Sequence, residues 1–146
     1  MRGHISVFKA LDKLTQLILS RNVNVIGSLA DLHTLENLGK LYLDGTSVGG
    51  ELSDISHFQF LTFLNLADTK VSGENGLDDL LDLIYHRKLR RIDVSGLDLT
   101  GLLPAALTHV PGILLKVFGT GLCVERLDPD INTAQFPFTL ISTKEL

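Results

Sequence analysis

The chain lacks most features of an extracellular or membrane-spanning protein. Its 146 residues include a single cysteine, Cys123, so no intrachain disulfide can form. There is no Asn-x-Ser/Thr glycosylation sequon, and no run of about 18 apolar residues that could cross a membrane. The N-terminus does not look like a signal peptide, because its leucines belong to a longer pattern. These absences predict an intracellular protein in a reducing compartment, either in the cytoplasm or inside an organelle.

The sequence also lacks recognisable catalytic and metal-binding motifs. It has no G-x-S-x-G nucleophile elbow and no phosphate-binding glycine loop. An Asp-x-Asp-x-Asn motif at 128–132 begins like a calcium loop, but Thr133 and Thr139 replace the glycine and glutamate that such a loop requires. We therefore expect no enzyme activity, no catalytic residue, no metal and no cofactor.

Charge is spread along the chain, with 13 basic and 17 acidic residues and a net charge of −4. The densest basic run, at 87–91, is typical of a helix C-terminus followed by a solvated turn. We therefore expect no nucleic-acid partner.

Leucine is abundant and recurs in register. A glycine lies 14 residues before four of the five apolar-x-apolar segments, and after three of these glycines, Gly3, Gly27 and Gly50, the apolar residues follow in steps of three. The five segments begin at Leu17, Leu41, Leu64, Ile92 and Leu115, which are 24, 23, 28 and 23 residues apart. This spacing fits neither one long helix nor one long strand. It predicts a coil with a short strand on one side and turns or 3₁₀ segments on the other, its apolar residues pointing to a common axis.

The turn after each strand is patterned too. A polar residue follows the second apolar residue by three positions in four of the five repeats: Asn22, Thr46, Thr69 and Thr120, with Leu97 in the exception. We expect these side chains to satisfy backbone groups of a buried turn. Each glycine of the apolar-x-Gly segments ending at Gly50, Gly73 and Gly101 should supply a positive φ or a close approach of two backbones.

One stretch allows comparison with a known family. Residues 97–107, Leu-Asp-Leu-Thr-Gly-Leu-Leu-Pro-Ala-Ala-Leu, resemble the plant-type leucine-rich repeat L-x-L-T/S-G-x-I-P-x-x-L. The resemblance covers roughly residues 3–122, although threonine stands where the family commonly has asparagine and only this repeat has the proline. It implies an α/β solenoid: a right-handed coil with a short parallel concave β-sheet of about five strands and a convex side of turns, 3₁₀ segments and helix. Proteins of this family bind many unrelated ligands.

The fourth repeat is longer than the others and predicts a true α-helix on the convex side, at about 77–87. Leu77, Leu80, Leu81 and Ile84 have helical spacing. Acidic residues come early in the segment and basic residues late, as the helix dipole favours.

The two ends depart from the pattern. Counting back from Leu17, the chain begins inside a repeat at Gly3, and no cap helix is evident. We expect Ile5, Phe8, Leu11 and Leu14 to be partly uncovered there. Either the chain is a fragment of a longer repeat protein, or another surface covers this end, including by self-association.

We assign residues 1–122 to the solenoid and 123–146 to a C-terminal tail. The tail contains two prolines and apolar bulk from Phe136, Phe138, Leu140 and Ile141. It is predicted to fold over the last coil as a cap, the alternative being an arm that docks on a partner.

The concave sheet is the predicted functional surface, because residues flanking the strand leucines must point outward. Its candidate partner-binding residues are Gln16, Ile18, Lys40, Tyr42, Asp44, Phe63, Asn65, Arg91, Asp93, Lys116 and Phe118. Candidate contacts at the ends are Ile5, Phe8, Phe136 and Phe138. Aromatic residues and arginine on a solvated sheet are typical of a protein-binding face.

The sequence thus predicts a non-catalytic module that binds a protein partner through its concave face or its ends. A structural subunit of a larger assembly is the alternative, and a fragment of a longer leucine-rich-repeat receptor or enzyme is a more remote one.

Overall fold

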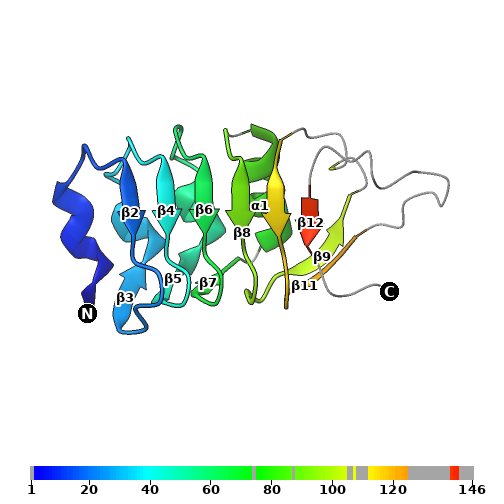
Figure 1. The fold of residues 1–146 in the computed structure, drawn as a ribbon, viewed down its shortest axis with the longest axis horizontal. Coiled ribbons are helices and arrows are strands. Elements are labelled where there is room, and N and C mark those ends of the chain that lie inside the picture. Colours follow the sequence, from blue (N-terminus) through cyan, green and yellow to red (C-terminus); the bar gives the residue numbers. More distant parts are fainter. Residues whose placement is uncertain are drawn as a thin grey trace.

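A computed structural model describes residues 2–73, 75–86, 88–104, 107, 112–124 and 139–141. The coils stack side by side, so that equivalent strands form one parallel sheet along the molecule (Figure 1). In sheet order its six strands are β12 (Thr139–Ile141), β10 (Leu114–Lys116), β8 (Arg91–Asp93), β6 (Phe63–Asn65), β4 (Lys40–Tyr42) and β2 (Gln16–Ile18). Five of them coincide with the five predicted apolar-x-apolar segments.

A second line of parallel strands follows the turns, and the sequence pattern did not predict it. One sheet has the order β1 (Gly3–His4), β3 (Val25–Ser28), β5 (Ser47–Glu51) and β7 (Lys70–Ser72). A two-stranded sheet joins β9 (Thr100–Leu103) to β11 (Gly121–Val124). The apolar-x-Gly segments build these strands, so most coils contribute two short strands rather than one.

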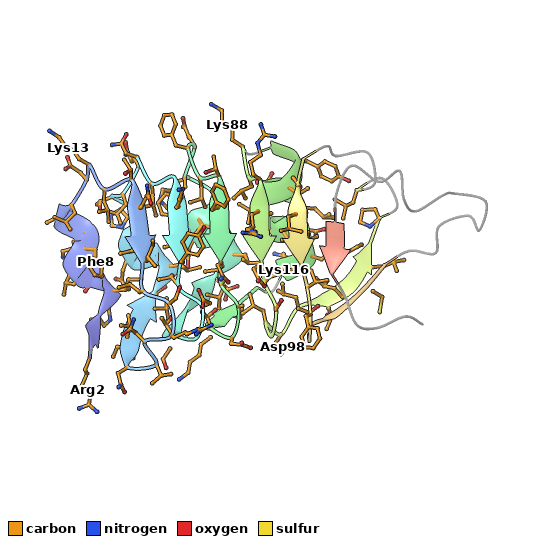
Figure 2. All side chains as sticks on the ribbon, viewed as in Figure 1. Arg2, Phe8, Lys13, Lys88, Asp98 and Lys116 are labelled. Carbon is orange, nitrogen blue, oxygen red and sulfur yellow. The ribbon has the colours of Figure 1, made fainter. Side chains whose placement is uncertain are left out.

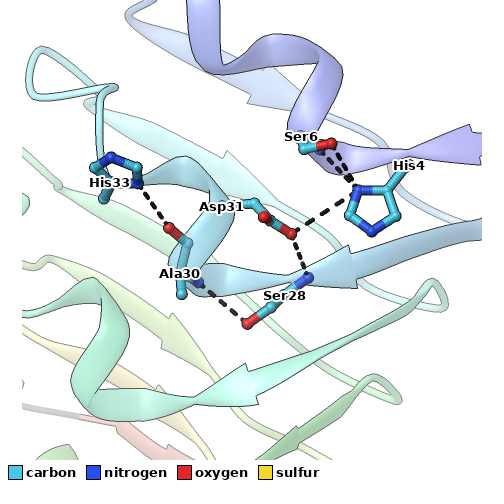
Figure 3. Close-up of polar contacts among 6 residues, drawn as sticks. All are labelled: His4, Ser6, Ser28, Ala30, Asp31 and His33. Atoms are coloured by element: carbon cyan, nitrogen blue, oxygen red, sulfur yellow. Dashed lines mark hydrogen bonds and ion pairs between the residues drawn. The ribbon is translucent and has the colours of Figure 1, made fainter.

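Within the described ranges, the remaining side of the coils includes the 3₁₀ segments η1 (Ile5–Ala10), η2 (Leu29–Leu32) and η3 (Leu52–Ile55) and the α-helix α1 (Gly76–His86). Capping boxes begin η2 and η3, with Ser28 and Asp31 in the first and Glu51 and Asp54 in the second. Asp31 Oδ2 accepts a hydrogen bond from Ser28 N at 2.9 Å and also lies 3.9 Å from His4 Nδ1 of the preceding coil (Figure 3). The caps therefore fix the local turns and also connect neighbouring coils.

Helix α1 occupies the segment where the longer repeat predicts a convex helix. Its first turn carries Asp78 and Asp79. Burial raises the pKa of Asp79, and Glu51, Asp78 and Asp82 raise it further. The folded chain therefore holds a proton at Asp79 more readily than the unfolded chain does. Stability present at low pH is lost as the pH rises through this pKa.

The core is a set of aligned columns along the solenoid axis. The central strand residues Leu17, Leu41, Leu64, Ile92 and Leu115 are in register, and each is at most 5% exposed. Burying one such side chain stabilises the fold by about 1.5–3 kcal/mol relative to leaving it in water. Because each column is filled by successive coils, every interior coil depends on both of its neighbours.

The threonine turns make the predicted contacts. Thr46 Oγ1 donates to Leu43 O at 2.7 Å and accepts from Val48 N at 3.5 Å. Thr69 and Thr120 bond to the equivalent groups of their own turns at similar distances. In the first repeat Asn22 Nδ2 donates to two carbonyls instead. One hydroxyl thus supplies both the donor and the acceptor that the turn needs.

The predicted glycine constraints are confirmed, in two different ways. Gly50 and Gly101 have φ of 103° and 134°. A Cβ at Gly50 would lie 2.6 Å from Ser28 Oγ and 2.9 Å from Leu29 N. At Gly73 φ is not in the left-handed region, but a Cβ would lie 2.7 Å from Gly76 Cα, so backbones approach closely there.

We expect Thr46→Val to lower the free energy of unfolding by about 1–3 kcal/mol, because Leu43 O and Val48 N lose a buried partner. Urea denaturation followed by circular dichroism measures the change. Thr15→Val is the matched control, since it makes the same chemical change at an exposed position. Equal losses in the two variants would show that the turn hydroxyl contributes nothing particular.

Gly50→Ala should destabilise the fold by more than about 1 kcal/mol, because alanine meets both a positive φ and neighbouring backbone. Gly3→Ala provides the control: an added Cβ there has no neighbour within 4 Å, at the equivalent position of the first repeat. Thermal unfolding compares the two variants. A tolerated alanine at Gly50 would contradict the close stacking of the coils.

Candidate functional site

The structure places all eleven predicted concave residues on one face. The strand register aligns them in rows across the sheet. The row at the beginning of the strands is Gln16, Lys40, Phe63, Arg91 and Leu114, and the row at their end is Ile18, Tyr42, Asn65, Asp93 and Lys116. Backbone hydrogen bonds continue the ladder beyond the strands, through Asp44 and Phe118 among others. Adjacent rungs of a parallel sheet are about 4.8 Å apart, so each row is a regular line of side chains.

Acidic groups on this face are satisfied within it. Asp44 Oδ1 accepts hydrogen bonds from Ser20 Oγ at 2.6 Å and from Asn65 Nδ2 at 3.0 Å, which joins three successive repeats. Asp93 Oδ1 accepts from Ser95 N at 3.1 Å, and its Oδ2 lies 3.6 Å from Lys116 Nζ. These contacts fix the side chains of the face before any partner binds.

Apolar groups are distributed along the face rather than gathered in one patch. Ile18 and Phe118 are 61% and 53% exposed and lie in the first and fifth strand repeats. Tyr42 and Phe63 lie between them and are partly buried. The Nζ of Lys40 lies 5.4 Å from the centroid of the Phe63 ring, in cation–π contact. The face therefore offers aromatic and apolar anchors over several repeats.

The loops leading into the strands are stacked by hydrogen bonds as well. Thr15 O accepts from the amides of residues 39 and 40, and Gly39 O accepts from those of residues 62 and 63. Thr62 O in turn accepts from Arg90 N at 2.8 Å and from Arg91 N at 3.2 Å. This ladder brings Phe60 near Lys88, whose Nζ lies 5.9 Å from the ring centroid.

Phe60, Lys88 and Arg90 were missed as site residues. The sequence pattern assigned Lys88 and Arg90 to a solvated turn after a helix and did not single out Phe60. The repeat register contains the missing signal, because Phe60 precedes Thr62 by the same two positions by which Lys88 precedes Arg90.

The candidate end contacts have a mixed outcome. The prediction that Ile5 is partly uncovered is wrong: its side chain is fully buried. Strand β1 pairs with β3, which brings the Ile5 side chain against Gly27. The contact is so close that a Cβ added at Gly27 would lie 2.5 Å from Ile5 Cγ2. Phe8 and Leu14 are partly buried and Leu11 is 49% exposed, as predicted. Phe136 and Phe138 lie outside the described residues.

Part of the predicted tail extends the concave sheet. Strand β12 pairs in parallel with β10, with Leu140 opposite Leu115. The Asp-x-Asp-x-Asn motif at 128–132 lies outside the described residues. The role of the rest of the tail, as cap or as docking arm, stays a prediction.

His33 and His57 lie apart from this face. His33 Nδ1 is 2.9 Å from Ala30 O (Figure 3), His57 packs on Phe58, and His109 lies outside the described residues. Within the described part of the chain, no three His, Cys, Asp or Glu side chains gather as a metal site would require. No described helix is long and apolar enough to cross a membrane.

Comparison with known proteins identifies the architecture. No protein-family model matches the chain, and no curated protein matches it by sequence. The leucine-rich-repeat ectodomain of the receptor kinase SOBIR1 from Arabidopsis thaliana is similar in structure, with a TM-score of 0.66 at 22% identity over 85% of this chain and 68% of that one. The plant peptide hormone receptor RGFR1, solved in complex with RGF2, gives a TM-score of 0.61 at 23% identity over 84% of this chain and 23% of the receptor.

This likeness establishes the fold, which is a leucine-rich-repeat solenoid. The fold class predicted from the sequence is confirmed.

Asp44→Ala should lower the free energy of unfolding by about 1 kcal/mol, because Ser20 and Asn65 both lose their shared acceptor on a partly exposed surface. Asp98→Ala is the control, since it removes the same charge at an exposed position after the turn. Urea midpoints of the two variants give the comparison. If Asp98→Ala costs as much, the links across repeats contribute no stability.

Proposed function

We propose that the chain is a non-catalytic protein-interaction module that binds a partner protein across its concave face. The observation that carries the proposal is the regular array of outward side chains over successive strands. Tyr42, Phe63 and Phe118 supply aromatic surface there, and Arg91 supplies an exposed guanidinium. Such residues are enriched among the anchors of protein interfaces.

The rigidity of the face supports the same proposal. Its strands are held by backbone ladders on both sides of each interior coil, and its carboxylates are already hydrogen-bonded. A surface that is ordered before binding loses little conformational entropy on association. The likeness to two receptor structures, one of them solved in complex with RGF2, is consistent with protein binding by this architecture.

We also propose an intracellular, reducing compartment, supported by the single cysteine, Cys123. SOBIR1 was solved as a receptor ectodomain. Fold similarity at this identity does not imply a shared compartment.

A second candidate function, that of a structural subunit, is favoured by exposed apolar side chains in the first coil. Val7, Leu11 and Ile18 are 68%, 49% and 61% exposed. Lateral packing of this end in an assembly would cover them.

The two candidates respond oppositely to surface variants. We expect Tyr42→Ala with Phe118→Ala to reduce retention of the native partner by about tenfold or more, because interface aromatics dominate binding energy. Val7→Asp should leave retention unchanged. The measurement is a pull-down of the tagged chain from its native extract, with stoichiometry determined by mass spectrometry and folding checked by circular dichroism.

The opposite pattern, with loss only for Val7→Asp, would favour the assembly subunit. Absence of any stoichiometric partner, or equal retention by all variants, would contradict binding through the concave face.

A further inference from the structure

We propose that the partner presents an acidic segment, which docks on the basic edge of the concave face; this rests on the proposed function. The edge consists of Lys40, Phe60, Phe63, Lys88, Arg90 and Arg91, and we call it the basic rim. It lies where the chain enters the strands (Figure 2 shows Lys88 at this edge and Asp98 at the opposite one).

The stacked loops place these residues on neighbouring rungs. Because Gly39, Thr62 and Arg90 continue one hydrogen-bond ladder, the residues that follow them, Lys40, Phe63 and Arg91, are aligned in the first row of the sheet. Phe60 and Lys88 lie two positions further back in the same loops and also contact each other. Residues remote in sequence thus form one continuous surface over three repeats.

Two of the rim cations are held on aromatic rings. Lys40 lies over Phe63 and Lys88 lies over Phe60, with the Phe60 side chain 54% exposed. The Arg90 side chain packs against Gly112 of the next repeat, so closely that a Cβ added at Gly112 would lie 2.9 Å from Arg90 Nη1.

No rim cation forms a salt bridge with another described residue. The two salt bridges within the described residues are His4–Asp31 and Lys116–Asp93, and neither includes a rim residue. The concave carboxylates Asp44 and Asp93 are already engaged. The rim residues include four cations and no carboxylate, although the whole chain carries −4 and the exposed Glu36 lies in the loop that leads to Lys40. A complementary partner must bring carboxylates.

The surroundings favour an acidic protein segment over a nucleic acid. Single-stranded nucleic acids bind where basic grooves adjoin free aromatic faces for base stacking. Here lysines lie over both phenylalanine rings. A net acidic chain also repels a long polyanion, whereas a short peptide with a few carboxylates meets mainly the local charge.

The test selects random 12-residue peptides, displayed on phage, against the immobilised full chain. We expect enrichment of Asp and Glu among the selected peptides. A synthetic peptide from this set should bind Lys88→Glu with Arg91→Glu about tenfold more weakly than the original chain, because two exposed ion pairs become repulsive. Its affinity should also fall as salt is raised.

Lys9→Glu with Lys70→Glu is the matched control, because it changes net charge equally at exposed positions outside the rim. It should keep the original affinity. Failure to select acidic peptides, or equal weakening by both double variants, would overturn the inference. So would tighter, rim-dependent binding of a 20-nucleotide single-stranded RNA, which would assign the rim to nucleic acid.

The native pull-down separates this inference from the proposed function. A partner lost with Tyr42→Ala and Phe118→Ala but retained when Lys88 and Arg91 are reversed would leave the proposed function standing and overturn the acidic segment. Loss of the partner with both sets of variants supports both.

Discussion

Each coil of this protein can bury its leucines only against the coils beside it. The columns running through Leu17, Leu41 and Leu64 are filled by one residue from each repeat. A shift of a single residue would move a leucine to the solvent face and a polar residue into the column. The register of the whole molecule therefore depends on burial of these columns. The threonine turns, the closely packed glycines and the stacked loops allow neighbouring coils to approach closely enough to bury these columns.

The same register explains which parts of the fold could be predicted. Strand positions, turn hydroxyls and closely packed glycines repeat at fixed offsets, so the roles of Thr46 and Gly50 could be predicted from the sequence. The second line of strands was missed because its segments are only two to five residues long and share no alternating pattern: β1 is Gly3–His4, whereas β5 is Ser47–Glu51. The burial of Ile5 was missed because it depends on pairing of β1 with β3, a contact between coils.

A repeated backbone conformation was also hidden from the sequence. Residues 21, 45, 68, 96 and 119 occupy one turn position and all have positive φ. Glycine occupies three of these positions, but Arg21 and Asp68 occupy the other two. A left-handed conformation costs a non-glycine residue about 1–2 kcal/mol, which the packed coils on either side must offset. The residue types at this turn position therefore vary more than its backbone conformation does.

For the concave face, alternation along the strands was enough to predict which side chains point outward, because successive residues of a strand point to opposite faces of the sheet. The contacts between these side chains were not predictable. Asp44 reaches Ser20 and Asn65 in the two neighbouring repeats, and Lys88 reaches Phe60, through contacts between coils that no single repeat shows. Lys88 and Arg90 lie at the same positions before their strand as Phe60 and Thr62 do before theirs, so the repeat register, rather than the insertion in the fourth repeat, places them at the rim.

The packed core and the proposed binding surface thus lie on opposite sides of the same strands. Inward residues such as Leu41 and Leu64 are fixed by packing, whereas outward residues such as Tyr42 and Arg91 face solvent beside them. Exchanging an outward residue costs the fold little, so one solenoid can present very different surfaces. At 22–23% identity the likeness to SOBIR1 and RGFR1 is consistent with shared inward requirements. The proposed partner must therefore be inferred from this chain's own outward charges, where Asp44 and Asp93 are engaged and the rim cations form no salt bridge with another described residue.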